Sequence, residues 1–305
     1  MRIGNLSGRL TLFTEEGAID VERASDGHFA ADPQAVYDRW SEFSRWATRA
    51  GGEPQPFSVD DLRAPAPRPA QVFAIGANYR AHAAEGGLDV PEWPMVFTKF
   101  VSSFTGPTGE IALPGLTVDW ETELVVVIGR SARHVPPASG WEHVAGLTVG
   151  QDLSERTVQL RGDYPQMCLG KSYPGFSPMG PYLVTPDEFE DPDRLALGCS
   201  VNGETVQQAS TADLVFSVSA LIAELSAVLP LEPGDLIFTG TPAGVGMVRN
   251  PPRFLQPGDE LSTYIEGIGE MHHRFVAGPS AASDDEATLS RQTLGARTPS
   301  IREER

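Results

Sequence analysis

The stretch VDWETELVVVIG, residues 118–129, constrains the fold more than any other part of the sequence. Its β-branched run at residues 125–128 has no polar face and therefore predicts a strand buried on both sides. Side chains alternate across a strand, so we expect Asp119, Glu121 and Glu123 on one face. A buried strand thus begins with three acids on one side.

Three carboxylates on one strand face repel one another unless something offsets their charge. The Cα atoms of neighbouring same-face residues are about 6.6 Å apart, and two unit charges at that separation repel by roughly 2.5 kcal/mol at an effective dielectric of about 20. An exposed strand end, basic partners from elsewhere or a bound divalent cation would each relieve this repulsion. The spacing alone leaves all three open, and an exposed end is the commonest outcome.

A further carboxylate, Asp152, follows a second apolar stretch, AGLTVGQD. If that stretch forms a strand beside the first one, Glu121, Glu123 and Asp152 converge as three oxygen ligands. Ligation by oxygen alone suits Mg²⁺ or Mn²⁺ and disfavours zinc, because no histidine or cysteine shares the cluster. A bound cation would explain why the acids are aligned.

The composition of the chain argues against some classes of binding partner. The chain has 305 residues with 23 basic and 41 acidic side chains, a formal charge of −18, which argues against binding nucleic acid or an anionic membrane. Its two cysteines, Cys168 and Cys199, provide neither a disulfide framework nor a metal cluster. No apolar run approaches the about 20 residues of a membrane span, and no signal segment is evident. We expect a soluble cytoplasmic protein that acts on a small molecule.

The chain divides into three parts by pattern. Residues 1–70 contain short strand-like pieces, an expected helix from Asp32 to about Ala50, and a Pro-rich connector, APAPRPA, which predict a small N-terminal α+β domain. Residues 71–276 alternate short strands and turns with one main helix, from about Thr211 to Val228, which predicts an α+β, mostly β catalytic domain. Residues 277–305 have too few large apolar side chains to order, so we expect a disordered tail.

Two other segments carry side chains suited to catalysis. His82 and Glu85 are three residues apart, so a helix would place them on one face, where the carboxylate can orient the imidazole as a base. An exposed histidine on a short helix fits the same spacing. Lys171 lies in a Gly/Pro-rich loop that is not a phosphate loop, because Pro165 occupies a required glycine position. Beside a metal, such a lysine can stabilise an enolate oxygen.

Nine segments, taken in order, resemble the fumarylacetoacetate hydrolase superfamily, and the likeness spans roughly residues 72–276. One such segment is unremarkable by chance, whereas nine in succession are specific. The segments are IGANYRAHAAE, PMVFTKF, IALP, DWETELVVVIG, GQDLSERTVQ, GKSYPGFSPMGP, VNGE, LEPGDLIFTGTPAGVG and PGDELSTYIEGIG.

The resemblance implies a mixed β-sandwich roll catalytic domain, a homodimer, and a Mg²⁺ or Mn²⁺ ion in the pocket. It points to the branch of acylpyruvate hydrolases and 2-hydroxyhepta-2,4-diene-1,7-dioate isomerases. Trp120 stands where the family more usually has tyrosine. By position, the family's site residues match the metal ligands Glu121, Glu123 and Asp152, the water-activating dyad His82 and Glu85, the lysine Lys171, and the substrate-contacting residues Arg156, Gln159 and Thr241.

The function that this resemblance implies is hydrolysis of a C–C bond. A 2,4-dioxo acid of the acylpyruvate or fumarylpyruvate type would give pyruvate and a carboxylic acid, with water activated by His82 and Glu85 and the enolate stabilised by the cation and Lys171. Oxaloacetate-type decarboxylation and 2-hydroxydienoate tautomerisation reach the same enolate and stay open as alternatives. A non-catalytic binding protein that kept the fold is a further alternative.

Overall fold

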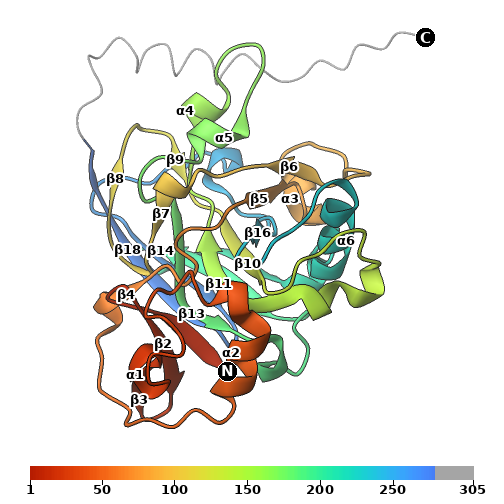
Figure 1. Cartoon of the computed structure of the whole chain (residues 1–305). Coiled ribbons are helices and arrows are strands. Elements are labelled where there is room, and N and C mark those ends of the chain that lie inside the picture. The colour runs from red at the N-terminus through yellow and green to blue at the C-terminus, as the bar shows by residue number, and fades with distance from the viewer. Residues whose placement is uncertain (279–305) are drawn as a thin grey trace.

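The structure is a computed structural model, and it describes residues 1–278 of the chain. The predicted tail lies outside these residues from position 279 onward. The fold is α+β and mostly β, as the sequence predicts, and consists of two large sheets, a two-stranded ladder and short helices (Figure 1). The α-helices are α1 (Val21–Ala24), α2 (Trp40–Ala47), α3 (Arg80–Glu85), α4 (Arg156–Gln159), α5 (Met167–Gly170) and α6 (Val218–Val228).

The larger sheet has eleven strands and runs through the centre of the molecule. Its main order is β3-β2-β1-β13-β11-β10-β16-β5-β6, with β4 beside β1 and β7 beside β13. The strands are β1 (Arg2–Leu6), β2 (Arg9–Thr14), β3 (Gly17–Asp20), β4 (Leu62–Arg63), β5 (Val72–Gly76), β6 (Met95–Phe97), β7 (Phe104–Thr105), β10 (Thr122–Ile128), β11 (Val144–Gln151), β13 (Ser177–Val184) and β16 (Leu236–Phe238).

The second sheet has five strands in the order β15-β14-β17-β18-β8, and β9 pairs with β12 in a separate short ladder. These strands are β8 (Thr108–Leu113), β9 (Val118–Asp119), β12 (Ser154–Glu155), β14 (Ala196–Val201), β15 (Glu204–Ser210), β17 (Glu260–Ile265) and β18 (Gly269–Ala277).

Strand β10 is buried along its whole length, as its apolar run predicts. All seven of its residues are buried, and it lies antiparallel between β11 and β16. Leu124 and Val126 face one apolar cluster, which includes α6, while Val125 and Val127 face another, which includes the N-terminal aromatic residues. Apolar contacts on both faces hold this strand in place, and it begins at the candidate site.

The N-terminal segment shares its sheet with the rest of the chain. Strand β1 pairs antiparallel with β13, with Ile3 opposite Leu183, and Trp40 and Phe43 pack in the same cluster as Val125. Figure 1 shows this segment, coloured red, as a lobe at one end of the large sheet. A division into independent domains at residue 70 stays a prediction.

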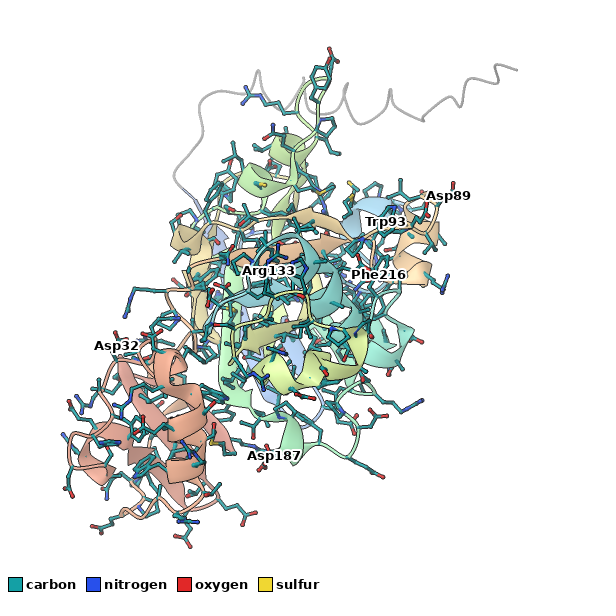
Figure 2. All side chains as sticks on the ribbon, turned by 45° about the vertical axis from the view of Figure 1, so that its right-hand side comes forward. Asp32, Asp89, Trp93, Arg133, Asp187 and Phe216 are labelled. Carbon is teal, nitrogen blue, oxygen red and sulfur yellow. The ribbon has the colours of Figure 1, made fainter. Side chains whose placement is uncertain are left out.

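Both long helices begin later than their patterns predict. Helix α2 begins at Trp40, because Asp32 lies in a turn on the N-terminal lobe, where its carboxylate accepts from the backbone of Gln34 and pairs with Arg68 (Figure 2). Helix α6 begins at Val218, because the side chain of Ser217 caps it. Among residues 1–278, no helix is long and apolar enough to cross a membrane.

Candidate metal centre

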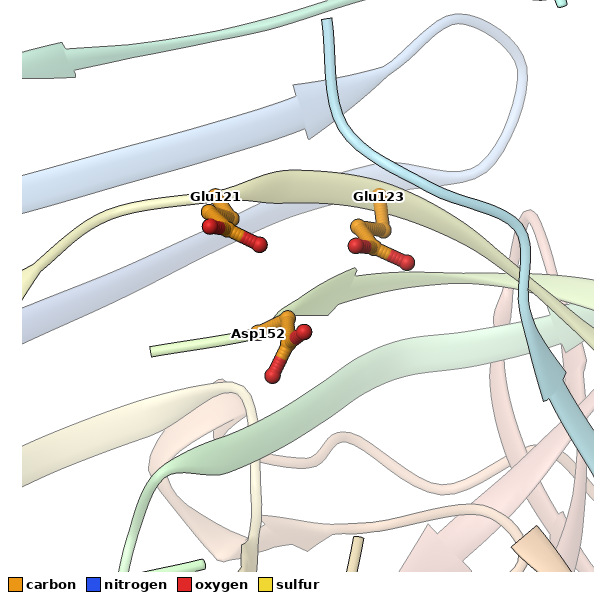
Figure 3. Close-up of side chains that lie close together, drawn as sticks. All are labelled: Glu121, Glu123 and Asp152. Atoms are coloured by element: carbon orange, nitrogen blue, oxygen red, sulfur yellow. The ribbon is translucent and has the colours of Figure 1, made fainter. Parts of the chain in front are cut away.

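The three predicted ligands converge where β10 begins and β11 ends. Glu123 lies opposite Gly150 in the antiparallel pair, and Asp152 follows directly after β11. One carboxylate oxygen from each of Glu121, Glu123 and Asp152 lies within 4.8 Å of the others (Figure 3). All three side chains are buried, so the alternative of an exposed, solvent-screened strand end does not apply.

Asp119 is not one of the three converging carboxylates, although its carboxylate and that of Glu121 contact the same guanidinium nitrogen of Arg156. The strand is interrupted between β9 and β10, at Trp120 and Glu121. The backbone N–H of Glu121 donates to the side chain of Gln151 at 2.8 Å, and that of Thr122 donates to the side chain of Gln207 at 2.9 Å. The regular alternation of a strand therefore does not extend back to Asp119.

Asp119 instead holds an arginine and a loop in place. Its carboxylate accepts from the guanidinium of Arg156 at 2.8 and 3.0 Å and from the backbone N–H groups of Gly246 and Met247 at 2.7 and 3.0 Å. The carboxylate of Asp119 is thus fully satisfied beside the cluster, and it shares Arg156 with Glu121.

Three buried cations surround the remaining acids. The Nζ atom of Lys171 lies 2.7 Å from Glu121 and 2.6 Å from Asp152, and Arg156 lies 2.7 Å from Glu121. Lys99 lies 2.5 Å from the other oxygen of Asp152 and also donates to the backbone carbonyl of Lys171. Sequence reasoning missed Lys99, because a single lysine in the apolar segment PMVFTKF gives no sign that it is buried.

The cations leave Glu123 without a charged partner. Within residues 1–278 no basic side chain lies at salt-bridge distance from Glu123, whose carboxylate accepts from the backbone N–H of Gly240 at 2.8 Å. Burial, together with the neighbouring charges of Asp152 and Glu121, raises the pKa of Glu123 well above its usual value. Burial also acts to raise the pKa of Glu121, but Lys171 and Arg156 outweigh it and hold that pKa at about 2.

This charge pattern fits a divalent cation. When all four are ionised, Asp119, Glu121, Glu123 and Asp152 supply four negative charges, against three positive charges from the two lysines and the arginine. A cation placed among the three converging carboxylates would supply the positive charge that Glu123 lacks. Three hard oxygen donors are the ligands that Mg²⁺ and Mn²⁺ prefer.

The predicted dyad lies on helix α3. The Nδ1 atom of His82 is 2.8 Å from one oxygen of Glu85, and the other oxygen accepts from the backbone N–H of Gly244 at 2.8 Å. Because a carboxylate accepts hydrogen bonds, Nδ1 carries the proton and Nε2 is left with its lone pair. A positive charge on His82 would lower the pKa of Glu121, so the imidazole lies close to the acidic cluster.

The predicted substrate contacts lie around the same cluster. Arg156 and Gln159 are both buried on α4, and the guanidinium donates to the amide oxygen of Gln159 at 2.9 Å. Thr241 is buried in the loop after β16, where its hydroxyl accepts from Gln207 at 2.8 Å. Trp120 is buried and its indole N–H donates to the carbonyl of Gly244. The roles of these side chains toward a substrate stay predictions.

A mostly β fold that buries three converging carboxylates beside a lysine and an oriented histidine defines a divalent-metal enzyme. The chain belongs to the fumarylacetoacetate hydrolase family, since the family's sequence model, described as "Fumarylacetoacetate (FAA) hydrolase C-terminal", matches residues 71–276. Human oxaloacetate tautomerase FAHD2A, mitochondrial, is 45% identical over 223 residues, which cover 72% of this chain and 71% of that relative.

Comparison with solved structures agrees with the assignment to this family. A Mycobacterium smegmatis protein provisionally named HpcE is 56% identical, with a TM-score of 0.89, and the match covers 92% of this chain and 100% of that one. Maleylpyruvate hydrolase from Sphingobium sp. SYK-6, in complex with manganese(II) and pyruvate, is 29% identical, with a TM-score of 0.71 and coverage of 92% and 100%.

These comparisons confirm the predicted superfamily and fold, and the prediction of an enzyme that acts on ketonic acids. They also confirm the predicted Mg²⁺ or Mn²⁺ cofactor, for which the chain has a buried set of three carboxylates. The expectation of a cytoplasmic protein is contradicted, because curated relatives such as the human tautomerase are mitochondrial by name. The absence of an evident signal segment was therefore a poor guide to location.

Proposed function

We propose that this enzyme transfers a proton between carbon and oxygen of a 2-oxo acid, as in the keto–enol tautomerisation of oxaloacetate. The observation that carries the proposal is the His82 imidazole, which Glu85 orients and which lies close to the buried acidic cluster. The 45% identity to an oxaloacetate tautomerase supports this reaction over the others that an enolate allows.

Each proposed step is assigned to a side chain of this chain. Nε2 of His82 takes a proton from the carbon next to the 2-oxo group and returns it to the oxygen, so no atom is gained or lost. The ammonium of Lys171 donates to the oxygen on which negative charge develops. Glu121, Glu123 and Asp152 would hold Mg²⁺ or Mn²⁺, which supplies a Lewis acid for polarising a carbonyl oxygen.

The remaining residues bind and orient the acid. Burial of the cluster excludes water and strengthens hydrogen bonds to a charged ligand. The hydroxyl of Thr241 is available to donate to a substrate carboxylate, because its oxygen already accepts from Gln207. Arg156 is committed to two acids, so in this proposal it fixes Glu121 and acts on the substrate through the charge it carries.

Hydrolysis of a 2,4-dioxo acid is the second candidate function. The same imidazole, with Nε2 free, can deprotonate a water as readily as a carbon acid. The similarity to a maleylpyruvate hydrolase crystallised with manganese and pyruvate favours this candidate over decarboxylation. Decarboxylation needs no activated water and would leave the dyad without a role.

Two assays separate these reactions. Conversion of enol to keto oxaloacetate is followed by the loss of the enol's ultraviolet absorbance, with Mg²⁺, with Mn²⁺ and with EDTA. We expect metal-dependent acceleration without formation of pyruvate. A small panel of acylpyruvates then tests hydrolysis, for which pyruvate and a carboxylic acid appear together. If the metal-loaded protein accelerates neither reaction, the proposal fails and the non-catalytic alternative replaces it.

The oligomeric state is a separate prediction. The family resemblance implies a homodimer, and light scattering coupled to size-exclusion chromatography measures it directly. A mass near twice 32.8 kDa is expected. A mass near the single-chain value would show that the site is complete within one chain.

A further inference from the structure

Gln207 links the second sheet to the candidate site, although neither its position nor its residue type suggests this in the sequence. It lies on β15, and its side chain is buried. Its amide oxygen accepts from the backbone N–H of Thr122 at 2.9 Å. Its amide nitrogen donates at 2.8 Å to the hydroxyl of Thr241 and at 2.8 Å to the carbonyl of Pro242. One side chain thus contacts the start of β10 and the loop after β16.

The loop at residues 239–246 carries several of the contacts that hold the site together. Its backbone N–H groups donate to Glu123 from Gly240 and to Glu85 from Gly244. The loop rests directly on β15, because a Cβ atom at Gly244 would lie 2.1 Å from the carbonyl oxygen of Val206. Gly244 also has a φ of +110°, which side chains rarely adopt. The position of the loop is therefore set by the part of β15 that contains Gln207.

The two ends of the Gln207 amide group have different roles, because its nitrogen donates hydrogen bonds and its oxygen accepts them. Because the amide N–H occupies a lone pair of the Thr241 oxygen, the hydroxyl proton is free to point at an anionic ligand. The amide oxygen meanwhile satisfies the N–H of Thr122, the first residue of β10, next to the strand interruption. A buried N–H without a partner is costly. Glutamine supplies both a donor and an acceptor at this reach without adding charge.

We propose that Gln207 is a positioning residue that orients the Thr241 hydroxyl as a donor to the substrate and fixes the 239–246 loop, which in turn holds Glu85. This inference deepens the proposed function and rests on it, since it assigns Thr241 to a carboxylate of the 2-oxo acid. Gln207 itself touches neither the carboxylate cluster nor the imidazole.

The first test compares two neighbouring glutamines of β15. Gln207→Met keeps the length of the side chain and removes its hydrogen bonds, whereas Gln208→Met alters an exposed residue of the same strand. We expect Gln207→Met to lower kcat/KM by about 10- to 100-fold, as for a buried group left unpaired, with a raised KM and with Mn²⁺ affinity within about threefold of wild type. Gln208→Met is expected to match wild type. Equal kcat/KM in the two variants would overturn the proposal.

A double-mutant cycle with Thr241→Val tests whether Gln207 acts through the threonine. If it does, Gln207→Met costs much less activity in the Thr241→Val background than in wild type. The same loss in both backgrounds would instead show that Gln207 only supports the fold. Should Gln207→Met fail to fold, Gln207→Glu keeps the acceptor for Thr122 and removes the donor to both Thr241 and Pro242. Gln207→Glu should lower kcat/KM in the wild-type background and have no further effect in the Thr241→Val background.

A readout without turnover separates this proposal from the proposed function. Hydrogen exchange of the peptide that covers residues 239–246 is measured by mass spectrometry in metal-free protein. We expect faster exchange in Gln207→Met than in wild type or Gln208→Met, because the Gly240 and Gly244 amides lose their fixed partners. Unchanged exchange overturns the positioning role. Faster exchange in Gln207→Met, combined with a wild-type protein that turns over no 2-oxo acid, would reject the proposed function alone.

Discussion

The carboxylate cluster and the histidine dyad lie side by side but are held in different ways. The cluster stands on two adjacent central strands, and the side chains of Glu121 and Asp152 are 7% and 0% exposed, each paired with two cations. The dyad stands on the six-residue helix α3, where the side chains of His82 and Glu85 are each 20% exposed. A hydrogen bond from the backbone N–H of Gly244 to Glu85 connects the dyad to the 239–246 loop.

This difference divides the site into a fixed part and an adjustable part. Buried strands with paired charges open only with global unfolding, whereas a short helix followed by exposed residues opens locally. The segment after α3 is exposed at Leu88 and at Trp93, which Figure 2 shows on the surface. We infer that ligand geometry at the cluster is set before a substrate binds, while the base depends on the 239–246 loop for its position.

The largest expected effect comes from the cluster. Glu123→Gln keeps the side-chain size and an acceptor for Gly240 but removes the carboxylate that has no cationic partner. We expect Mn²⁺ affinity to fall by more than about 10²-fold, beyond the loss typical of an outer-shell partner, and turnover to disappear. Isothermal titration with Mn²⁺ measures this directly.

Denaturation of the metal-free protein provides the control for Glu123→Gln. Removing an unpaired buried charge should leave the free energy of unfolding unchanged or increased. Wild-type Mn²⁺ affinity in this variant would show that the cation binds elsewhere and would remove the distinction between a fixed cluster and a separate base.

The second-largest expected effect comes from replacing His82, the proposed general base. His82→Asn should lower kcat by about 10²- to 10⁴-fold, the usual contribution of general acid–base catalysis, with Mn²⁺ affinity kept, because the imidazole is not part of the cluster. Arg80→Ala, at an exposed position on the same helix, is the matched control. A fall in Mn²⁺ affinity together with kcat would mean that the dyad and the cluster are one unit.

Glu85→Gln should have a smaller effect than His82→Asn. The imidazole remains, but the negative charge that fixes its tautomer is lost and the bond to Gly244 weakens. We expect kcat to fall by about 10- to 100-fold, as for residues that orient a functional group. Steady-state kinetics of the two variants, measured under the same conditions, shows which variant loses more of its kcat. Equal losses would indicate that Glu85 itself reacts.

The sequence predicts the parts of the site that depend on neighbouring residues in one strand or helix. The convergence of Glu121 and Glu123 with Asp152 follows from two strands and their pairing, and the contact of His82 with Glu85 follows from helical spacing. The later start of α6 was also readable, because Ser217 is a capping residue three positions before Ala220.

The features that the sequence does not predict depend on distant segments. Asp119 lies outside the three-carboxylate set, and the strand after it is interrupted where Gln151 and Gln207 accept the N–H groups of Glu121 and Thr122 from 30 and 85 residues away. Lys99 is buried because Asp152, 53 residues later, pairs with it. Local periodicity contains no information about such partners, so these residues can be found only when the sheets are assembled.

The smallest expected effect lies in the second sheet, far from the catalytic chemistry, and concerns pH. His273 on β18 is buried and donates from Nε2 to the carbonyl of Gly106, and burial lowers its pKa from 6.5 to about 4. The unfolded chain therefore takes up a proton as pH falls below 6.5, before the folded protein does. The stability that neutral His273 contributes is fully present above pH 6.5 and is lost as pH falls toward 4.

By pH 5.5 this group alone should cost on the order of 1 kcal/mol of the free energy of unfolding. His273→Gln keeps an N–H donor without titrating, so urea denaturation at pH 7.5 and 5.5 should show a smaller acid-induced loss than wild type. His272→Gln, whose side chain is 59% exposed, is the control on the same strand and should retain the wild-type difference. Equal pH dependence in all three proteins would show that His273 does not cause the acid-induced loss of stability.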